Sequence, residues 1–416
     1  MKKYITLAAI ALVASAACSK VETLDTTPDQ KIAFEVAPYA AQTKADDGGL
    51  LKELENELGI TADQAFKSTA YINADNGAGA TNLSLFFVTS PETISWDSTN
   101  TEWAPSRDYY WPKSPNSNID FFSWYVYGTA GDPALTYDGS AATLAWASKT
   151  IASKEDILFA DIACHQTGNQ TTYLHDGVTE GVPTLFHHAL AQVRFTAKIK
   201  ENCDKKEDSK NAGNYTFWEV ILSDVNLASV FSTGTLSLSA TVPATKGTQA
   251  WTVPTDNIWT SPSNEIATSS AWFSTEYANG GNTPLELTAH YLNANAIADN
   301  YITVLPQTVT DNMKLTFKMT INTYYGADLA SAKTAGAINP PEVISVTAFA
   351  TDDATDAYDA AGILLNKLGT TPITAWEMNK KITYNIIIDP STTTILYDPA
   401  VEDWVAESAD VNIPKE

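Results

Sequence analysis

The hydrophobic and polar positions along most of this chain follow the pattern of β-strands. Short runs rich in β-branched and aromatic residues recur, several of them alternate with period two, and Gly, Asn, Asp, Ser and Pro separate them. Clear examples are residues 83–88, 193–199 and 381–388. Many short strands separated by turn residues are typical of β-sandwiches. The pattern therefore predicts an all-β fold.

Helical periodicity is scarce. In residues 49–59, Leu51, Leu54 and Leu58 fall on one helical face, and Gly59 supplies a C-terminal stop. Residues 360–368 show a weaker version of the same pattern. The sequence therefore predicts a short helix at 49–59 and a second, weaker one at 360–368.

The length of 416 residues exceeds one ordinary domain and favours two, and an apolar content of 44% is enough to form their cores. We expect the junction near residues 181–183, just before a strand predicted at 184–200. This places an N-terminal β-sandwich domain at 45–183 and a C-terminal one at 184–416. The polar, Lys-rich residues 201–214 are predicted to form an exposed loop inside a hairpin.

The first residues carry an export signal. Lys2 and Lys3 precede the apolar run 4–13 and the small residues 14–17, and Cys18 follows directly. The apolar run is too short to span a bilayer and its flanks are those of a secretory signal. A Cys after small residues resembles a bacterial lipobox, which predicts a signal peptide at 1–17 and acylation of Cys18 as a membrane anchor. An ordinary signal peptidase site with an incidental Cys is the alternative.

The net charge limits the possible binding partners, and the cysteines raise the question of a disulfide. The net charge of −24 argues against nucleic acid, whose phosphates would be repelled. Besides Cys18 the chain has Cys164 and Cys203, which can pair in an oxidising compartment if their Cα atoms come within reach. The sequence leaves this disulfide open.

Six segments, spread over nearly the whole chain, together resemble the motifs of the Bacteroidetes fimbrillin family in order and spacing. They are Tyr109-Tyr-Trp-Pro112, residues 119–125, residues 183–195, Val304-Leu-Pro-Gln307, residues 376–389 and Val401-Glu-Asp-Trp404. The resemblance implies a type V pilus subunit with two tandem transthyretin-like β-sandwich domains. It also implies export as a lipoprotein to the outer membrane, assembly into a surface fimbrium with other pilin subunits, and no cofactor.

The resemblance further implies how such subunits assemble. In this family a trypsin-like surface protease cuts after a basic residue near the N-terminus, which releases the first strand and opens an apolar groove for a strand of another subunit. Residues 31–37 read as such a strand, with Ile32, Phe34 and Val36 on one face, and Pro38 is expected to end its pairing. Lys44 is the only basic residue between Lys31 and Lys52, in a polar, Gly-containing context. Cleavage between Lys44 and Ala45 would remove residues 18–44 as a propeptide.

The far end of the chain offers a replacement strand. Ala409, Val411 and Ile413 alternate with polar residues in 405–413, beyond Trp404. An extended segment with matching alternation can add to an exposed sheet edge. We predict that these three residues belong to a donor strand. The alternative is that this segment closes its own domain.

No motif indicates catalysis or metal binding. The five histidines, His165, His175, His187, His188 and His290, lack close ligand spacing, and no nucleophile elbow or phosphate-binding loop is present. We expect a surface-loop position for His165 and a strand position with one satisfied ring nitrogen for His187 or His188. The 11 Trp and 18 Tyr are expected to fill cores.

Two functions are consistent with the sequence. The leading one is a structural pilin that assembles by strand exchange. The alternative is a monomeric, lipid-anchored glycan-binding surface protein, which needs neither Lys44 nor a donor strand and would present aromatic side chains to a polysaccharide.

Overall fold

The structure is a computed structural model, and the fold is predominantly β, which confirms the predicted all-β class. The structure describes residues 30–38, 65–75, 81–97, 99–100, 102–128, 130–151, 155–168, 181–266, 276–278, 285–286, 301–345, 358–359, 362–366, 373–390 and 394–403. Within these residues, helix is limited to α2 (Leu329–Ala335) and the 3-10 turn η2 (Thr255–Asn257).

The largest sheet has ten strands. In spatial order they are β16 (Gly247–Gln249), β10 (Ile162–Gln166), β6 (Asn118–Tyr127), β9 (Asp156–Ala160), β11 (Val182–His188), β1 (Phe34–Pro38), β5 (Glu102–Pro105), β4 (Glu92–Asp97), β2 (Ala65–Asp75) and β3 (Thr81–Leu85). An additional pairing of β6 with β2 closes a circuit of strands that runs from β6 through β1 and back to β2. The apolar interior of this circuit is the first core of the molecule.

Strand β6 explains how a second core forms beside the first. Its side chains Ile119, Phe121 and Tyr125 point into the first core, whereas Phe122 and Trp124 point to the other face. A strand buried on both faces has a nearly continuous apolar sequence, as residues 119–125 do. The second face is covered by a four-stranded sheet of β17 (Thr260–Glu265), β15 (Phe231–Thr241), β8 (Ala141–Thr150) and β7 (Ala134–Tyr137).

The remaining strands enclose a third core. One sheet contains β19 (Leu285–Glu286), β12 (Ala191–Ile199), β27 (Lys380–Asp389) and β28 (Thr394–Asp403), with β20 (Ile302–Val304) also on β12. The facing sheet contains β13 (Lys205–Glu207), β14 (Tyr215–Ala228), β22 (Lys314–Gly326), β25 (Gly362–Leu364) and β24 (Tyr358–Asp359), with β18 (Glu276–Ala278) on β14 and β23 (Glu342–Ser345) on β22. The strands β21 (Gln307–Thr308) and β26 (Ala375–Trp376) form a separate pair.

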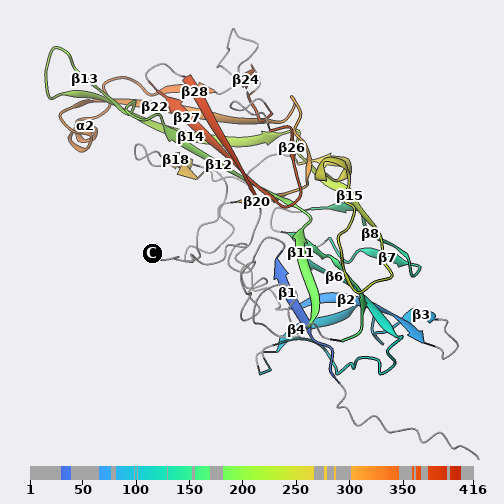
Figure 1. The fold of residues 1–416 in the computed structure, drawn as a ribbon. Helices are drawn as coiled ribbons and strands as arrows, with labels where there is room; N and C mark the ends of the chain where they lie inside the picture. The colour runs from blue at the N-terminus through green and yellow to red at the C-terminus, as the bar shows by residue number, and fades with distance from the viewer. Residues whose placement is uncertain are drawn as a thin grey trace, which may run out of the picture.

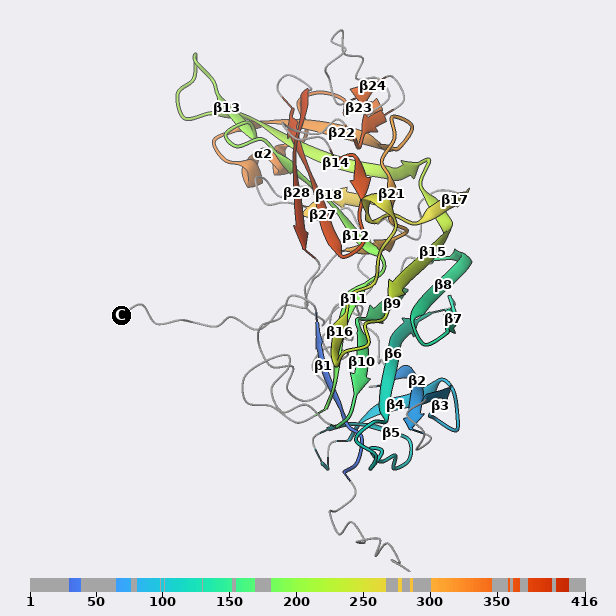
Figure 2. The ribbon, with the colours of Figure 1, turned by 45° about the vertical axis from the view of Figure 1, so that its right-hand side comes forward.

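These groups are arranged along an elongated molecule. Figure 1 shows β12, β14, β22 and β27 at one end, β1, β2 and β4 at the other, and β8 and β15 between them. The view in Figure 2 shows the same order. The ends therefore have separate cores, and β11 leads from one to the other through Ala189 and Leu190 into β12.

Two local expectations were wrong. The strand predicted at 184–200 is split, because β11 and β12 pair in different sheets on either side of Ala189 and Leu190. The helix predicted at 360–368 is wrong where β25 occupies Gly362–Leu364, since these residues are buried in the third core and pair with β22. β1 ends at Pro38, which is in register with Phe186 of β11, and the residues after it lie outside the described ones, so the expectation that Pro38 ends pairing stays a prediction. The short helix α2, capped by Asp328, was not predicted.

Other expectations hold or stay open. Residues 205–207 and 215–217 pair as a hairpin, and the residues at its tip are largely exposed, in line with the loop predicted at 201–214. The expected domain junction at 183 lies inside β11, and β15 and β16, which follow it in the chain, pair with β8 and β10, which precede it. The division at 45–183 and 184–416 stays a prediction.

Candidate functional site

The candidate site is strand β1 together with the groove that it fills. β1 runs parallel to β11, in register from Phe34 with Val182 to Pro38 with Phe186. Its other neighbour is β5, with which it pairs antiparallel at Phe34 and Trp103. β1 is thus the strand that joins β11 to β5 in the closed circuit. Removing it would leave the backbone edges of β11 and β5 without this partner.

The side chains predicted to form the removable face all point into the first core. Ile32, Phe34 and Val36 are 2%, 2% and 5% exposed. They pack in one cluster with residues from β2, β4, β5, β6, β9 and β11. Burying side chains of this size contributes about 1.5–3 kcal/mol each. The groove beneath β1 would therefore be strongly apolar if the strand left it.

Phe34 occupies the centre of this groove. Its ring makes edge-to-face contacts with Phe66 of β2 and Phe121 of β6, each at 5.6 Å between ring centroids. Phe66 in turn contacts Trp103 of β5 at 5.5 Å and Phe186 of β11 at 5.3 Å. We call Phe66, Trp103, Phe121 and Phe186 the aromatic box.

Gly181, just before β11, permits the close approach of β1. A Cβ atom at Gly181 would lie 2.5 Å from the backbone N of Glu35 and 2.6 Å from the carbonyl carbon of Phe34. Both atoms belong to backbone, which cannot move aside as a flexible side chain can. The position therefore requires glycine for as long as β1 is seated. From the sequence, residue 181 was expected only as part of a domain junction at 181–183.

Two backbone hydrogen bonds and one ion pair hold the residues just before β1. The backbone N of Ile32 donates to the Tyr109 carbonyl at 2.9 Å, and the N of Trp111 donates to the Gln30 carbonyl at 3.0 Å. At the surface, Lys31 Nζ lies 2.7 Å from Asp108 Oδ2. This hydrogen bond raises the pKa of Lys31 and lowers that of Asp108. An exposed pair of this kind adds little stability, so the backbone ladder with β11 and the apolar face hold the strand.

Several predicted site residues lie outside the described residues. They are Cys18, Lys44, Ala45, Ala409, Val411 and Ile413. The signal peptide at 1–17 and the helix predicted at 49–59 also lie outside them. Toward the C-terminus the described chain reaches β28, which pairs with β27 from Asp403 with Lys380 to Thr394 with Asp389.

The histidines of β11 are structural. His187 Nε2 lies 2.9 Å from Asp161 Oδ1, and buried His188 Nδ1 lies 3.0 Å from Asp156 Oδ2. The expectation of strand histidines with a satisfied ring nitrogen is confirmed for both. The surface-loop position expected for His165 is wrong. It lies in β10 and is largely buried, with its backbone N 2.7 Å from Asp120 Oδ1, because β10 packs against β6.

The two downstream cysteines are not joined by a disulfide. Cys164 is buried in the second core, and Cys203 packs against the third. Burial raises the pKa of the Cys164 thiol to about 12, which makes it unreactive as a nucleophile at neutral pH.

Aromatic residues mostly fill the cores. Among the described residues, buried tryptophans occur in all three clusters, and Tyr110 is the only aromatic residue among the exposed large hydrophobic ones. The described residues contain no group of three potential metal ligands. None of their helices has the length and apolar content that a membrane span requires.

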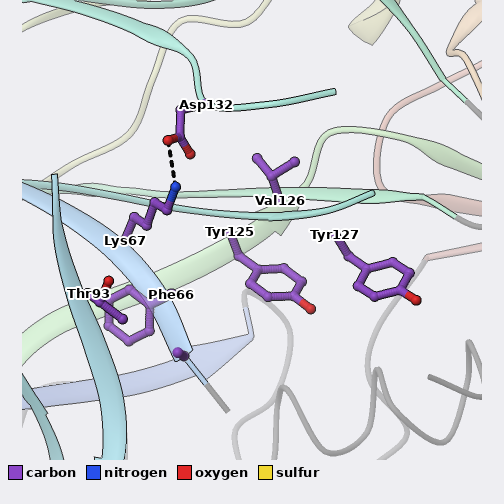
Figure 3. A pocket seen from close by; sticks show the side chains of 8 residues that line it. Phe66, Lys67, Thr93, Tyr125, Val126, Tyr127 and Asp132 are labelled. Atoms are coloured by element: carbon purple, nitrogen blue, oxygen red, sulfur yellow. Dashed lines mark hydrogen bonds and ion pairs between the residues drawn. The ribbon is translucent and has the colours of Figure 1, made fainter. Parts of the chain in front are cut away.

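A cavity of about 330 Å³ opens beside the aromatic box. Figure 3 shows its lining: Phe66 and Thr93, the rings of Tyr125 and Tyr127 on one side of β6, and Lys67 opposite Asp132. Lys67 Nζ donates to Asp132 Oδ2 at 2.6 Å. The cavity therefore combines aromatic surface with one ion pair.

The sequence model of the fimbrillin-like family matches residues 43–404. No curated protein sequence matched.

Solved structures that this chain matches include a fimbrial protein from Bacteroides vulgatus, with 15% identity, 91% of this chain and 100% of that chain covered, and a TM-score of 0.46. The fimbrial anchor protein Mfa2 from Porphyromonas gingivalis has 9% identity, with 91% of this chain and 99% of that chain covered, and a TM-score of 0.24. The tip fimbrial protein Mfa3 from the same organism, with a C-terminal truncation, has 11% identity, 82% and 94% coverage and a TM-score of 0.22.

Proposed function

The chain belongs to the fimbrillin-like family, and we propose that it is a structural subunit of a cell-surface pilus that assembles by strand replacement. The observation that carries this proposal is the seating of β1. A short strand close to the N-terminus fills an apolar groove with Ile32, Phe34 and Val36, and Lys44 follows it in the sequence. A subunit of this kind acts by binding other subunits, so no catalytic group or cofactor is required.

In this proposal a trypsin-like surface protease cuts between Lys44 and Ala45. The cut separates residues 18–44, with their strand and the lipid on Cys18, from the rest of the chain. Loss of β1 opens the circuit between β11 and β5 and exposes the apolar groove. Because exposed apolar surface and unpaired strand edges favour association, the cleaved subunit takes up a strand from another subunit. Before cleavage, acylated Cys18 holds the protein at the outer membrane.

The donor in this proposal is a C-terminal segment. Ala409, Val411 and Ile413 of one subunit would enter the groove of a neighbouring subunit, with Asp410 and Asn412 turned outward. A slip of one residue would turn these polar side chains into the groove at a cost of several kcal/mol for an unpaired charge. The proposal includes the organisation of the chain as two tandem transthyretin-like sandwich domains.

The direct test is the N-terminus of the assembled protein. Mass spectrometry of pili sheared from the cell surface should find chains that begin at Ala45 and lack residues 18–44. A matched Lys44→Gln variant should retain acylated Cys18 and give no polymer ladder. Assembled protein that still carries acylated Cys18 would contradict the proposal.

The glycan-binding alternative rests on the cavity of Figure 3, which half-buried Tyr127 lines together with Lys67 and Asp132. Aromatic faces with nearby hydrogen-bonding groups suit a sugar ring. This function predicts an uncleaved monomer whose glycan binding is lost in a Tyr127→Ala variant. Cleavage at Lys44 with polymer formation would reject it as the main function.

A further inference from the structure

The groove beneath β1 favours an aromatic side chain at its centre. The four side chains of the aromatic box come from four strands, β2, β5, β6 and β11, and each is at most 3% exposed. The ring of Phe34 meets Phe66 at an interplanar angle of 79° and Phe121 at 85°. Edge-to-face contacts of this kind need a ring, because they depend on the quadrupole of the aromatic system.

An aliphatic side chain at this position would leave space unfilled. Protein interiors are close-packed, so a smaller group loses contacts with the walls and leaves a cavity. The box cannot collapse readily around such a group, because Phe66 is also held by Trp103 and Phe186. The flanking positions of Ile32 and Val36 are occupied by aliphatic groups. The groove thus fits an aromatic residue with aliphatic residues two positions before and after it.

The segment 405–413 of this chain lacks that pattern. If Ala409, Val411 and Ile413 enter the groove together, Val411 takes the central position in either chain direction. A shift by two residues puts Ile413 at the centre and Lys415 at one flank, or Ala409 at the centre and Glu407 at one flank. None of these registers supplies a ring, and the shifted ones bring a charge into an apolar groove.

We propose that the strand that replaces β1 comes from a different protein and carries an aromatic side chain at the central position, flanked by aliphatic ones. This inference rests on the proposed function, because it needs β1 to leave. A second copy of this chain is then a poor donor, and its segment 405–413 serves the groove of another kind of subunit. The protein assembles as one member of a mixed polymer.

The test is peptide exchange in the full chain. Residues 44–47 are replaced by the recognition sequence of a site-specific protease, so that the cut does not depend on cleavage at Lys44. After cutting, labelled peptides of equal length are added, and release of the β1 fragment and retention of label are measured. The peptides have the sequences of residues 30–38 and 405–413, each with and without a change at the central position.

The peptide 30–38 should enter and be retained, and its Phe34→Val form should bind about tenfold more weakly or worse, because it loses the ring contacts and leaves a cavity. Peptide 405–413 should bind as weakly as that form, and Val411→Phe should recover about tenfold or more. An Ile32→Val peptide is the matched control, since it removes one methylene outside the box and should change binding only about threefold. A Phe121→Leu protein should reduce the preference for Phe over Val.

Retention of unchanged peptide 405–413 as strong as that of 30–38, with no gain from Val411→Phe, would overturn the inference and identify a second copy as an adequate donor. If no peptide enters, the groove does not accept a new strand and the inference also fails. Failure of natural cleavage after Lys44 is read separately from the N-terminus of surface protein, so it counts against the proposed function alone.

Discussion

β1 and β27 lie at opposite ends of the molecule, and each pairs in parallel with a neighbouring strand. They differ in how firmly the rest of the sheet holds them. β1 runs parallel to β11, and β27 runs parallel to β12, from Gln192 with Lys381 to Ile199 with Ile388. Both strands bury a row of large side chains in a core. They differ at their second edge. β27 pairs with β28 along its whole length, whereas β1 pairs with β5 only at Phe34 and Trp103.

This difference separates two ways of holding a strand. β27 is fixed by continuous backbone ladders on both sides as well as by its side chains, among them Tyr384, which stacks on Phe195 at 4.9 Å. β1 depends on a short ladder and on its apolar face. A strand held mainly by apolar side chains can be replaced by another strand of similar shape. The groove contacts the side chains of the strand, and a different protein can supply them. The comparison predicts that β1 is exchangeable and β27 is not.

The largest contrast is expected from a buried charge in each strand. Ile386→Asp in β27 should prevent folding of the third core, because Ile386 is fully buried and the strand cannot leave its two neighbours. An unpaired buried charge costs several kcal/mol. Phe34→Asp should expel β1 and leave the third core folded. Limited proteolysis read by mass spectrometry checks both: the comparison fails if Phe34→Asp also opens β12, β27 and β28.

A smaller effect is expected when the ring of Phe34 is removed without adding a charge. Phe34→Ala should destabilise the first core by about 3–5 kcal/mol, from lost burial and the cavity left in the aromatic box. The control Leu85→Ala, at a residue that is 54% exposed, should change the unfolding free energy by less than about 0.5 kcal/mol. Urea unfolding followed by tryptophan fluorescence measures both. Equal losses would show that β1 is not seated by its central ring.

The third effect concerns backbone approach. Gly181→Ala should loosen β1 at a cost of about 1–3 kcal/mol, because the new Cβ meets the backbone of Phe34 and Glu35. Gly168→Ala is the matched control, since its Cβ would meet only the end of the Gln30 side chain, at 3.3 Å. Thermal unfolding should separate the variants. A Gly181→Ala protein as stable as the control would mean that β1 lies farther from β11 than the structure has it.

The smallest effect serves as a reference away from β1, in the hairpin of β13 and β14 (Figure 2). The Tyr325 hydroxyl donates to Asp208 Oδ2 at 2.7 Å and, with other hydrogen bonds, lowers the pKa of Asp208 to about 2. A lowered pKa means that the ionised carboxylate stabilises the folded hairpin above pH about 4, and that this contribution is lost as the pH falls toward 2.

Tyr325→Phe should therefore raise the pKa of Asp208 toward its ordinary value, as an NMR titration can measure. Tyr215→Phe, in the same hairpin, should leave it near 2. Neither change should alter the seating of β1. An unchanged Asp208 pKa in Tyr325→Phe would show that the other hydrogen bonds to this carboxylate suffice.

The site was predictable from sequence in part. Alternation alone placed Ile32, Phe34 and Val36 on one face, because side-chain direction in a strand has period two. It did not indicate the aromatic box, since Phe66, Trp103, Phe121 and Phe186 lie far apart in the sequence and meet only through long-range pairing. The need for glycine at 181 likewise depends on a backbone that approaches from residues 34–35.

The fold shows the same limit. Strands β12 and β27 were expected because their alternation faces one core. The break between β11 and β12 was missed, because Ala189 and Leu190 are apolar and carry no turn signal, yet they lead from one sheet to another. Residues 362–364 read as a helix because they are apolar and lie near alanines, whereas pairing with β22 makes them a strand.

The most direct test of whether β1 is the removable strand is hydrogen–deuterium exchange of the full-length protein before and after the chain is cut between Lys44 and Ala45. After the cut and removal of the released fragment, we expect faster exchange in β11 and β5, which lose β1, and in the strands of the aromatic box. Protection in β12, β27 and β28 should stay unchanged. Retention of residues 30–38 under native conditions, with the same protection throughout, would contradict the claim that β1 is the removable strand.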